Sequence, residues 1–162
     1  MRRAPVTNMR LPVLQGMRRT LLGIAATALG LLAFAPAAMS RESAAQTLTV
    51  KSSSYGRVLF DGRGYVLYAF TRDAKGRSAC YTACAKAWPV YYASGTLRVG
   101  PGLERSLLGT TKRRDGRRQI TYAGRPLYYY VGDRKPGQIR CQNVAEFGGT
   151  WLVVRPSGRL VR

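Results

Sequence analysis

The stretch YAFTRD at residues 68–73 decides the fold, because the chain repeats its pattern as YYYVGD at residues 128–133. Each copy holds a tyrosine, an aromatic residue two positions later and an aspartate three positions after that. Side chains two positions apart lie on the same face of a strand, so both rings of a copy face one way. The paired motif therefore predicts two related structural units. Its residues are Tyr68, Phe70 and Asp73 in the first copy and Tyr128, Tyr130 and Asp133 in the second.

Each motif lies in a longer pattern that is typical of a β-hairpin. Residues 57–70 and residues 118–131 each hold two runs rich in β-branched and aromatic residues, on either side of a turn that contains glycine. A cysteine follows each hairpin, Cys80 or Cys141, and each repeat closes on a tryptophan followed by apolar residues. This ordered series favours a true internal repeat over chance.

We therefore expect a mainly β fold, a single compact domain of two antiparallel β-hairpin repeats. One short helix is predicted near residues 78–87, where Ser78 suits the cap and Pro89 limits the end. The predicted organisation is an export signal at 1–40, a polar leading segment at 41–54, the first repeat at 55–93, a connecting segment at 94–116 and the second repeat at 117–162.

The predicted export signal consists of a basic region followed by an apolar core. Arg18 and Arg19 precede the apolar residues 21–35, which are fewer than a membrane-spanning helix needs, and small residues follow them. We expect cleavage within residues 37–45, by the general or the twin-arginine route, with Met1 or Met17 as the start. No cysteine lies near this region. We expect a periplasmic or secreted protein without a lipid anchor and without a transmembrane helix after cleavage.

The composition excludes several kinds of chemistry. The 162 residues include 27 Lys and Arg, 7 Asp and Glu and no His, which gives a net charge of +20. A chain without histidine has no histidine general base, no Ser-His or Cys-His pair and no histidine metal ligand. We expect no enzymatic activity, identify no catalytic residue and predict no cofactor. Residues 41–162 keep 22 basic and 7 acidic residues, so the net charge of +15 belongs to the folded domain.

The motif side chains have a structural and a functional interpretation. Asp73 and Asp133 suit turns in which the carboxylate accepts a backbone N–H, and carboxylates are also ligands for cations. The alternating rings suit a core, while further tyrosines beside arginines suit the stacking of sugars or other rings. The sequence identifies no metal.

The three cysteines leave three arrangements open in an exported protein. Cys80 can pair with Cys84 in a distorted turn, either can pair with Cys141 and join the repeats, or all three can form a metal or redox site. The odd number requires one thiol outside any intramolecular disulfide.

The densest basic run surrounds the Asp-Gly turn at residues 115–116, which predicts a charged hairpin tip. Such a run serves solubility or attracts a polyanion. The expected partners are anionic polymers of the envelope or another envelope protein, and nucleic acid is not expected. The oligomeric state is not predicted. The candidate contact residues are Arg113, Arg114, Arg117 and Arg118.

The paired motif, together with the run from Cys80 through Cys84 to Trp88-Pro89, resembles a bacterial family called secreted repeat of unknown function. Its members are described as lipoproteins with a Tyr-x-aromatic-x-x-Asp motif, and the resemblance extends over residues 55–155. It implies export and carries no agreed catalytic residues. We therefore expect an exported, non-enzymatic binding or envelope-associated module. The alternative is a redox, electron-transfer or metal-binding accessory protein that uses the cysteines.

Overall fold

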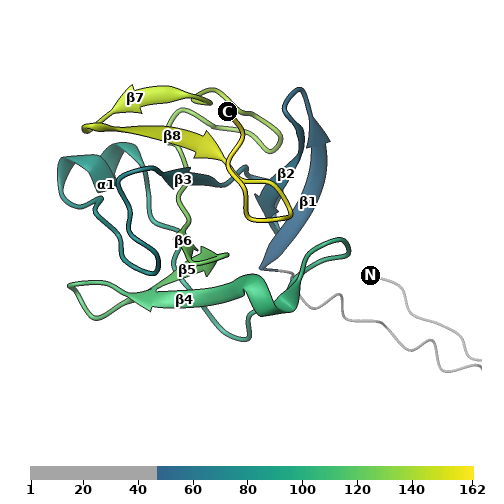
Figure 1. Cartoon of the computed structure of the whole chain (residues 1–162), viewed down its shortest axis with the longest axis horizontal. Coiled ribbons are helices and arrows are strands. Elements are labelled where there is room, and N and C mark those ends of the chain that lie inside the picture. The colour runs from purple at the N-terminus through teal and green to yellow at the C-terminus, as the bar shows by residue number, and fades with distance from the viewer. Residues whose placement is uncertain (1–46) are drawn as a thin grey trace, which may run out of the picture. The chain divides into compact units, whose positions relative to one another are not determined.

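The computed structural model of the protein describes residues 47–162 (Figure 1). These residues form a mainly β fold, as the sequence predicts, and none of their helices is long and apolar enough to cross a membrane. The predicted export signal lies outside the described residues. The elements are β1 (Leu48–Ser53), β2 (Gly56–Asp61), β3 (Tyr68–Phe70), α1 (Ala83–Ala87), a 3-10 helix (Arg105–Leu107), β4 (Leu108–Lys112), β5 (Arg118–Tyr122), β6 (Arg125–Pro126), β7 (Val144–Glu146) and β8 (Gly149–Val153).

The strands form three small antiparallel sheets. β1 pairs with β2, β8 lies between β3 and β7, and β5 lies between β4 and β6. Figure 1 shows β7 and β8 on one side of β3, β4 and β5 on the other, and the β1–β2 hairpin beside them. Two clusters of buried side chains fill the interior, one rich in aromatic rings and one rich in leucine.

The first hairpin pairs differently from the sequence expectation. β2 pairs over its whole length with β1, which lies in the predicted polar leading segment. In β1, the apolar residues Leu48 and Val50 alternate with polar ones, which gives the strand one face for the core. Beyond the turn at 61–64, β2 contacts the following chain through a bridge between Phe60 and Val66. β3 then pairs with β8 of the second repeat.

The two repeats meet at equivalent residues. The backbone N–H of Tyr68 donates to the carbonyl oxygen of Tyr128 at 2.9 Å, and the N–H of Tyr128 donates to the carbonyl oxygen of Tyr68 at 2.9 Å. Two equivalent residues that exchange both bonds in an antiparallel pair lie about a local two-fold axis. The motif tyrosines therefore mark the centre of the fold.

The helix α1 is shorter than the predicted 78–87. It begins at Ala83, because Thr82 has a positive φ of 48° that no helix contains. Upstream of it, the Ser78 hydroxyl accepts the backbone N–H of Cys80, which makes a local turn instead of a helical cap. The helix ends before Trp88 and Pro89, as expected where proline follows.

Candidate functional site

The motif tyrosines and aspartates form two reciprocal pairs across the repeats. The Tyr68 hydroxyl donates to Oδ2 of Asp133 at 2.7 Å, and the Tyr128 hydroxyl donates to Oδ2 of Asp73 at 2.8 Å. Each tyrosine therefore finds its carboxylate in the opposite repeat. The Tyr128 hydroxyl also lies 2.7 Å from the Ser78 hydroxyl, so this pair belongs to a larger buried network.

The second oxygen of each motif aspartate holds the loop that follows it. Oδ1 of Asp73 accepts the backbone N–H of Ala79 at 2.7 Å, and Oδ1 of Asp133 accepts the N–H of Arg140 at 2.9 Å. The donors lie six and seven positions along the chain, further than in a simple Asx turn. Both oxygens of each carboxylate thus have protein partners, which argues for a structural role of the motif over cation binding.

Burial controls the protonation of these groups. Removal from water raises the pKa of Tyr68 and of Tyr128 well above the ordinary value, so both hydroxyls remain donors. Burial also raises the pKa of Asp73 to about 6, against the opposing effect of its hydrogen bonds to Ala79 and Tyr128. Burial is also the main reason that the pKa of Asp133 is raised.

The remaining motif rings pack across the repeats in the same reciprocal manner. Phe70 stacks on Trp151 with ring centroids 4.2 Å apart, and Tyr130 packs on Trp88 at 4.7 Å. The two tryptophans stack on each other at 3.9 Å with their planes 2° apart. Nε1 of Trp88 donates to Glu146, whereas the buried Nε1 of Trp151 has no partner among residues 47–162. Tyr68, Phe70 and Tyr128 are therefore core, one of the two interpretations that the sequence allows, and the partly buried Tyr130 packs against them.

The cysteines adopt the first of the three predicted arrangements. Cys80 and Cys84 form a disulfide with a Cα–Cα distance of 5.3 Å, and Cys141 is buried and outside any disulfide. Burial raises the pKa of the Cys141 thiol, so it is protonated at neutral pH. Among the described residues, no group of three His, Cys, Asp or Glu side chains is arranged to hold a metal ion.

One of the four candidate contact arginines lies inside the protein. Arg113 is 5% exposed, and its guanidinium donates to Ser78 Oγ and to Gln119 Oε1, each at 2.7 Å. It also donates to the carbonyl oxygen of Cys80. A guanidinium buried among these partners cannot contact a polymer. The expectation that Arg113 is a contact residue is therefore wrong. The sequence pattern missed this because two of the acceptors, Ser78 and Cys80, lie in a loop more than thirty residues away along the chain.

The other three candidates lie on the β4–β5 tip, the turn formed by residues 112–118. Arg114, Arg117 and Arg118 are exposed and are called the tip arginines below. The Arg114 guanidinium lies over the ring of Tyr81, 4.4 Å from its centroid, and that of Arg117 lies over Tyr92 at 3.3 Å. Rings beneath the cations restrict the motion of these exposed side chains.

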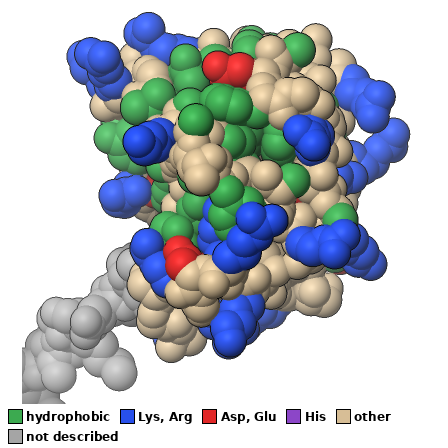
Figure 2. Space-filling model, turned by 90° about the vertical axis from the view of Figure 1, so that its left-hand side faces the viewer, with side chains coloured by type: hydrophobic (Ala, Val, Ile, Leu, Met, Phe, Trp, Pro, Cys, Tyr) green, Lys and Arg blue, Asp and Glu red, His purple; other side chains and the backbone are tan. Residues whose placement is uncertain are grey.

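Few acidic groups oppose the basic surface. Within residues 47–162 the structure holds one ion pair, Arg63 to Asp61 at 2.9 Å. The same residues contain 21 Lys and Arg and 6 Asp and Glu. Five of the six acids accept hydrogen bonds from tyrosine, tryptophan or backbone donors, and only Asp61 pairs with a cation. Figure 2 accordingly shows basic side chains spread round the visible face with few acidic ones between them.

Two surface hollows lie outside the predicted site. A groove of about 660 Å³ includes Tyr91, Tyr92 and Tyr129 in its lining, and the Tyr129 hydroxyl donates to Asp61 at 3.0 Å. A second hollow of about 550 Å³, the arginine cup, is lined by Arg125, Arg155, Ser157, Arg159, Leu160 and Arg162. The cup residues show no run in the sequence dense enough to single them out.

The chain is similar to a family of secreted proteins. The sequence model of a family described as secreted repeat of unknown function matches it twice, over residues 49–91 and 109–155. These two matches together span more than half of the chain. Neither the curated proteins nor the solved structures yielded a match.

Proposed function

Because the chain belongs to the family of secreted repeats of unknown function, we propose that it is an exported, non-enzymatic module that binds anionic polymers of the bacterial envelope. The observation that carries this proposal is the unbalanced charge of residues 47–162, where 21 basic side chains form one ion pair. A surface with so few opposing charges attracts polyanions over a distance of about a Debye length. Another envelope protein with an acidic surface is the second kind of partner that this charge suits.

The tip arginines are the proposed contact site. Tyr81 and Tyr92 support two of the guanidinium groups, and Oδ1 of Asp115 accepts the backbone N–H of Arg117 at 3.0 Å to fix the turn. Side chains held in place lose less conformational entropy on binding. Binding through several such cations releases counterions from the polymer, so the affinity falls as salt increases.

The cysteines support this proposal over the redox alternative. The Cys80–Cys84 disulfide packs in the aromatic core cluster, and the Cys141 thiol has a raised pKa. A reactive cysteine is usually an accessible thiolate in an electropositive setting. We further propose a periplasmic or secreted location without a lipid anchor, since the three cysteines of the chain all lie in the folded domain.

Binding of polygalacturonate, a soluble carboxylate polymer, tests the proposal, with neutral dextran as the reference polymer. We expect the exported protein to bind polygalacturonate at about 50 mM salt with an affinity that falls steeply as salt rises, and not to bind dextran. The triple variant R114Q/R117Q/R118Q should bind about tenfold more weakly. Circular dichroism checks that the variant keeps its fold.

The matched control removes three other exposed charges, in R134Q/K135Q/R140Q. It should retain an affinity within about threefold of wild type, because these residues lie outside the tip. Equal losses in the two triple variants would exclude the tip as the contact site. Absence of polygalacturonate binding at low salt would refute the proposed function.

A further inference from the structure

The arginine cup gathers four guanidinium groups from two segments of the second repeat. Arg125 lies in β6, and Arg155, Arg159 and Arg162 lie in the C-terminal segment after β8. No acidic residue lines the cup, and none of the four arginines takes part in the ion pair formed within residues 47–162. Like charges that share a hollow repel one another, and this repulsion is relieved when an anion binds.

A tight turn at the C-terminal segment builds the cup. The N–H of Gly158 donates to the carbonyl oxygen of Arg155 at 2.8 Å, and the N–H of Arg155 donates to that of Arg159 at 2.8 Å. Gly158 has a φ of +79°, and a Cβ atom there would lie 2.2 Å from Cβ of Ala123. Only glycine therefore lets this turn pack against the β5–β6 turn.

Two side chains that flank the β5–β6 turn also hold the C-terminal turn in place. The Tyr122 hydroxyl donates to the carbonyl oxygen of Pro156 at 2.8 Å, and Nε of Arg125 donates to that of Gly158 at 3.0 Å. The half-buried Arg125 is thus held at Nε, and the hydrogen bonds among residues 47–162 leave its terminal amino groups for a ligand. The turn and the Arg125 guanidinium are therefore in place before a ligand arrives, while Arg155, Arg159 and Arg162 are exposed around them.

We infer that the arginine cup binds a phosphate group of the envelope polymer. All four cations are arginines, whose planar forks match phosphate oxygens in pairs. A phosphodiester carries one negative charge and a phosphomonoester up to two, and their free oxygens are arranged tetrahedrally so that several guanidinium groups can contact them from different directions, whereas the two oxygens of a carboxylate lie in one plane. Ser157 adds a hydroxyl donor, and the volume of about 550 Å³ suits a small ligand.

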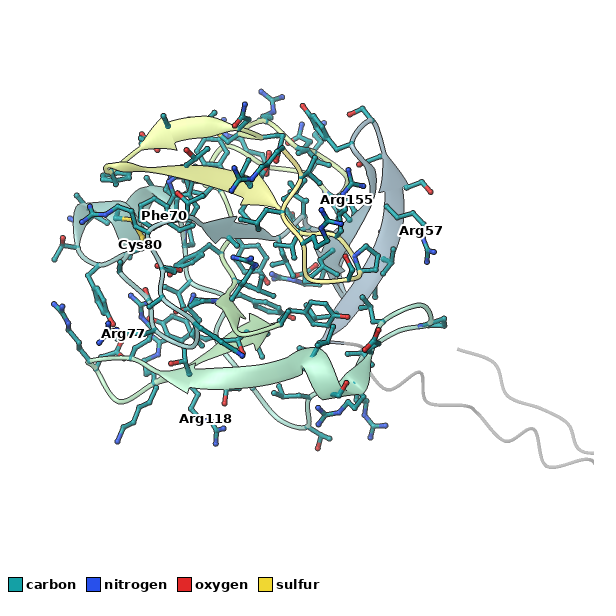
Figure 3. The ribbon with its side chains drawn as sticks, in the orientation of Figure 1. Arg57, Phe70, Arg77, Cys80, Arg118 and Arg155 are labelled. Atoms are coloured by element: carbon teal, nitrogen blue, oxygen red, sulfur yellow. A yellow bond between two sulfur atoms is a disulfide. The ribbon has the colours of Figure 1, made fainter. Side chains whose placement is uncertain are left out.

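The cup is separate from the proposed polymer contact at the tip. In Figure 3, Arg118 of the tip and Arg155 of the cup lie on different sides of the protein. The phosphate inference deepens the proposed function and rests on it for the nature of the polymer. The two regions can nevertheless be tested independently, since each can be changed without touching the other.

The experiment measures binding of pyrophosphate to the exported protein by calorimetry, with citrate as a carboxylate probe at the same ionic strength. We expect pyrophosphate to bind one to one and about tenfold more tightly than citrate. The double variant R155Q/R159Q should lose about tenfold in pyrophosphate affinity. Both residues are exposed, so this variant should keep the fold. The matched control R114Q/R117Q, which removes two charges from the tip, should bind pyrophosphate as wild type does.

A charge-conserving variant tests the geometry. Arg125→Lys keeps the positive charge but loses the planar fork and the bond from Nε to Gly158, so we expect about tenfold weaker pyrophosphate binding. Thermal melting checks its fold. Wild-type affinity in this variant, equal losses in R155Q/R159Q and R114Q/R117Q, or equal binding of citrate and pyrophosphate would each overturn the inference.

Poly(glycerol phosphate) separates a phosphodiester polymer from a free phosphate as the source. If this polymer binds more tightly than pyrophosphate and the binding is lost in R155Q/R159Q, the polymer is the source of the phosphate. If the protein binds pyrophosphate and not this polymer, the polymer is excluded as the source. If R155Q/R159Q binds every phosphate probe normally while R114Q/R117Q/R118Q fails to bind polygalacturonate, the cup fails and the proposed function stands. If the cup binds pyrophosphate but the protein binds neither polymer, the proposed function fails and the phosphate site stands.

Discussion

Tyr68 and Tyr128 each donate to a carboxylate that lies more than fifty residues away in the other repeat. The motif Tyr-x-aromatic-x-x-Asp therefore describes a contact between repeats, although its residues are close together in the sequence. The spacing of the motif predicts that the rings share a face. It does not predict which carboxylate each hydroxyl meets, because that depends on the bridge between Tyr68 and Tyr128, which brings the two motifs together.

Arg113 is a second residue whose surroundings could not be predicted from the sequence. A sequence with basic residues on both sides of Asp-Gly predicts an exposed tip, and this holds for the three tip arginines. Arg113 differs because Ser78, Gln119 and the carbonyl oxygen of Cys80 surround its guanidinium. No local pattern distinguishes it from Arg114, so its burial could not be predicted.

The carboxyl of Asp73 gives the protein a pH-dependent stability. Its pKa is raised from 3.8 to about 6 in the folded state, so folding favours the protonated form. The group's stabilising contribution is fully present below pH 3.8 and is lost as the pH rises through about 6. Between about pH 4 and pH 7.5, we expect this group alone to lower the free energy of unfolding by about 2 kcal/mol.

Urea unfolding of wild type and D73N at several pH values measures this effect. An asparagine resembles the protonated acid and does not titrate, so D73N should lack this part of the pH dependence. The remaining slope in D73N reports the other groups, including Asp133, whose pKa is raised in the same direction. Parallel pH profiles for the two proteins would show that Asp73 titrates normally.

At the scale of the elements, the disulfide beside α1 is the clearest local constraint. It closes a loop with a sequence separation of 4, which restricts the unfolded chain only modestly. We expect C80S/C84S to lower the free energy of unfolding by about 2 kcal/mol. Reductant should bring wild type to the same stability and leave the double variant unchanged.

The control for the disulfide is C141A. This variant removes a buried thiol outside any disulfide, so its stability should respond to reductant as wild type does. Denaturant unfolding with and without reductant makes the comparison. The prediction fails if reductant leaves wild type unaffected or destabilises C80S/C84S to a similar extent.

Some secondary-structure elements could be predicted from the sequence pattern, whereas the pairing of others could not. The alternation of residues 118–122 and the glycine turn after them predict a hairpin, and β5 does pair with β6 across that turn. The returning strand is only Arg125–Pro126, however, and the expected run at 127–131 is not a strand. In the first repeat, residues 68–70 are a strand as the pattern indicates, but their ladder partner is β8. A strand buried on both sides carries no signal for its neighbour, since either neighbour would cover the same apolar residues.

At the scale of the whole molecule, the excess of basic side chains opposes folding through mutual repulsion. We expect the melting temperature to rise when NaCl is increased from about 10 mM to about 300 mM, because salt screens this repulsion. Differential scanning calorimetry measures the rise. In R134Q/K135Q/R140Q the rise should be smaller, since three charges are absent. A melting temperature that is constant or falls with salt would mean that repulsion does not limit the stability.

The reciprocal contacts between the repeats have a consequence for how the two halves can change. In a dimer of identical chains with this geometry, each substitution would occur twice, once on either side of the axis. Here both halves belong to one polypeptide, so a substitution changes one side alone. The second repeat has Ala145 where an offset of 61 residues from Cys84 would place a cysteine, and Trp88 has a hydrogen-bond partner that Trp151 lacks. Because the two halves are covalently joined, their surfaces can differ in sequence while the contacts at the shared centre are kept.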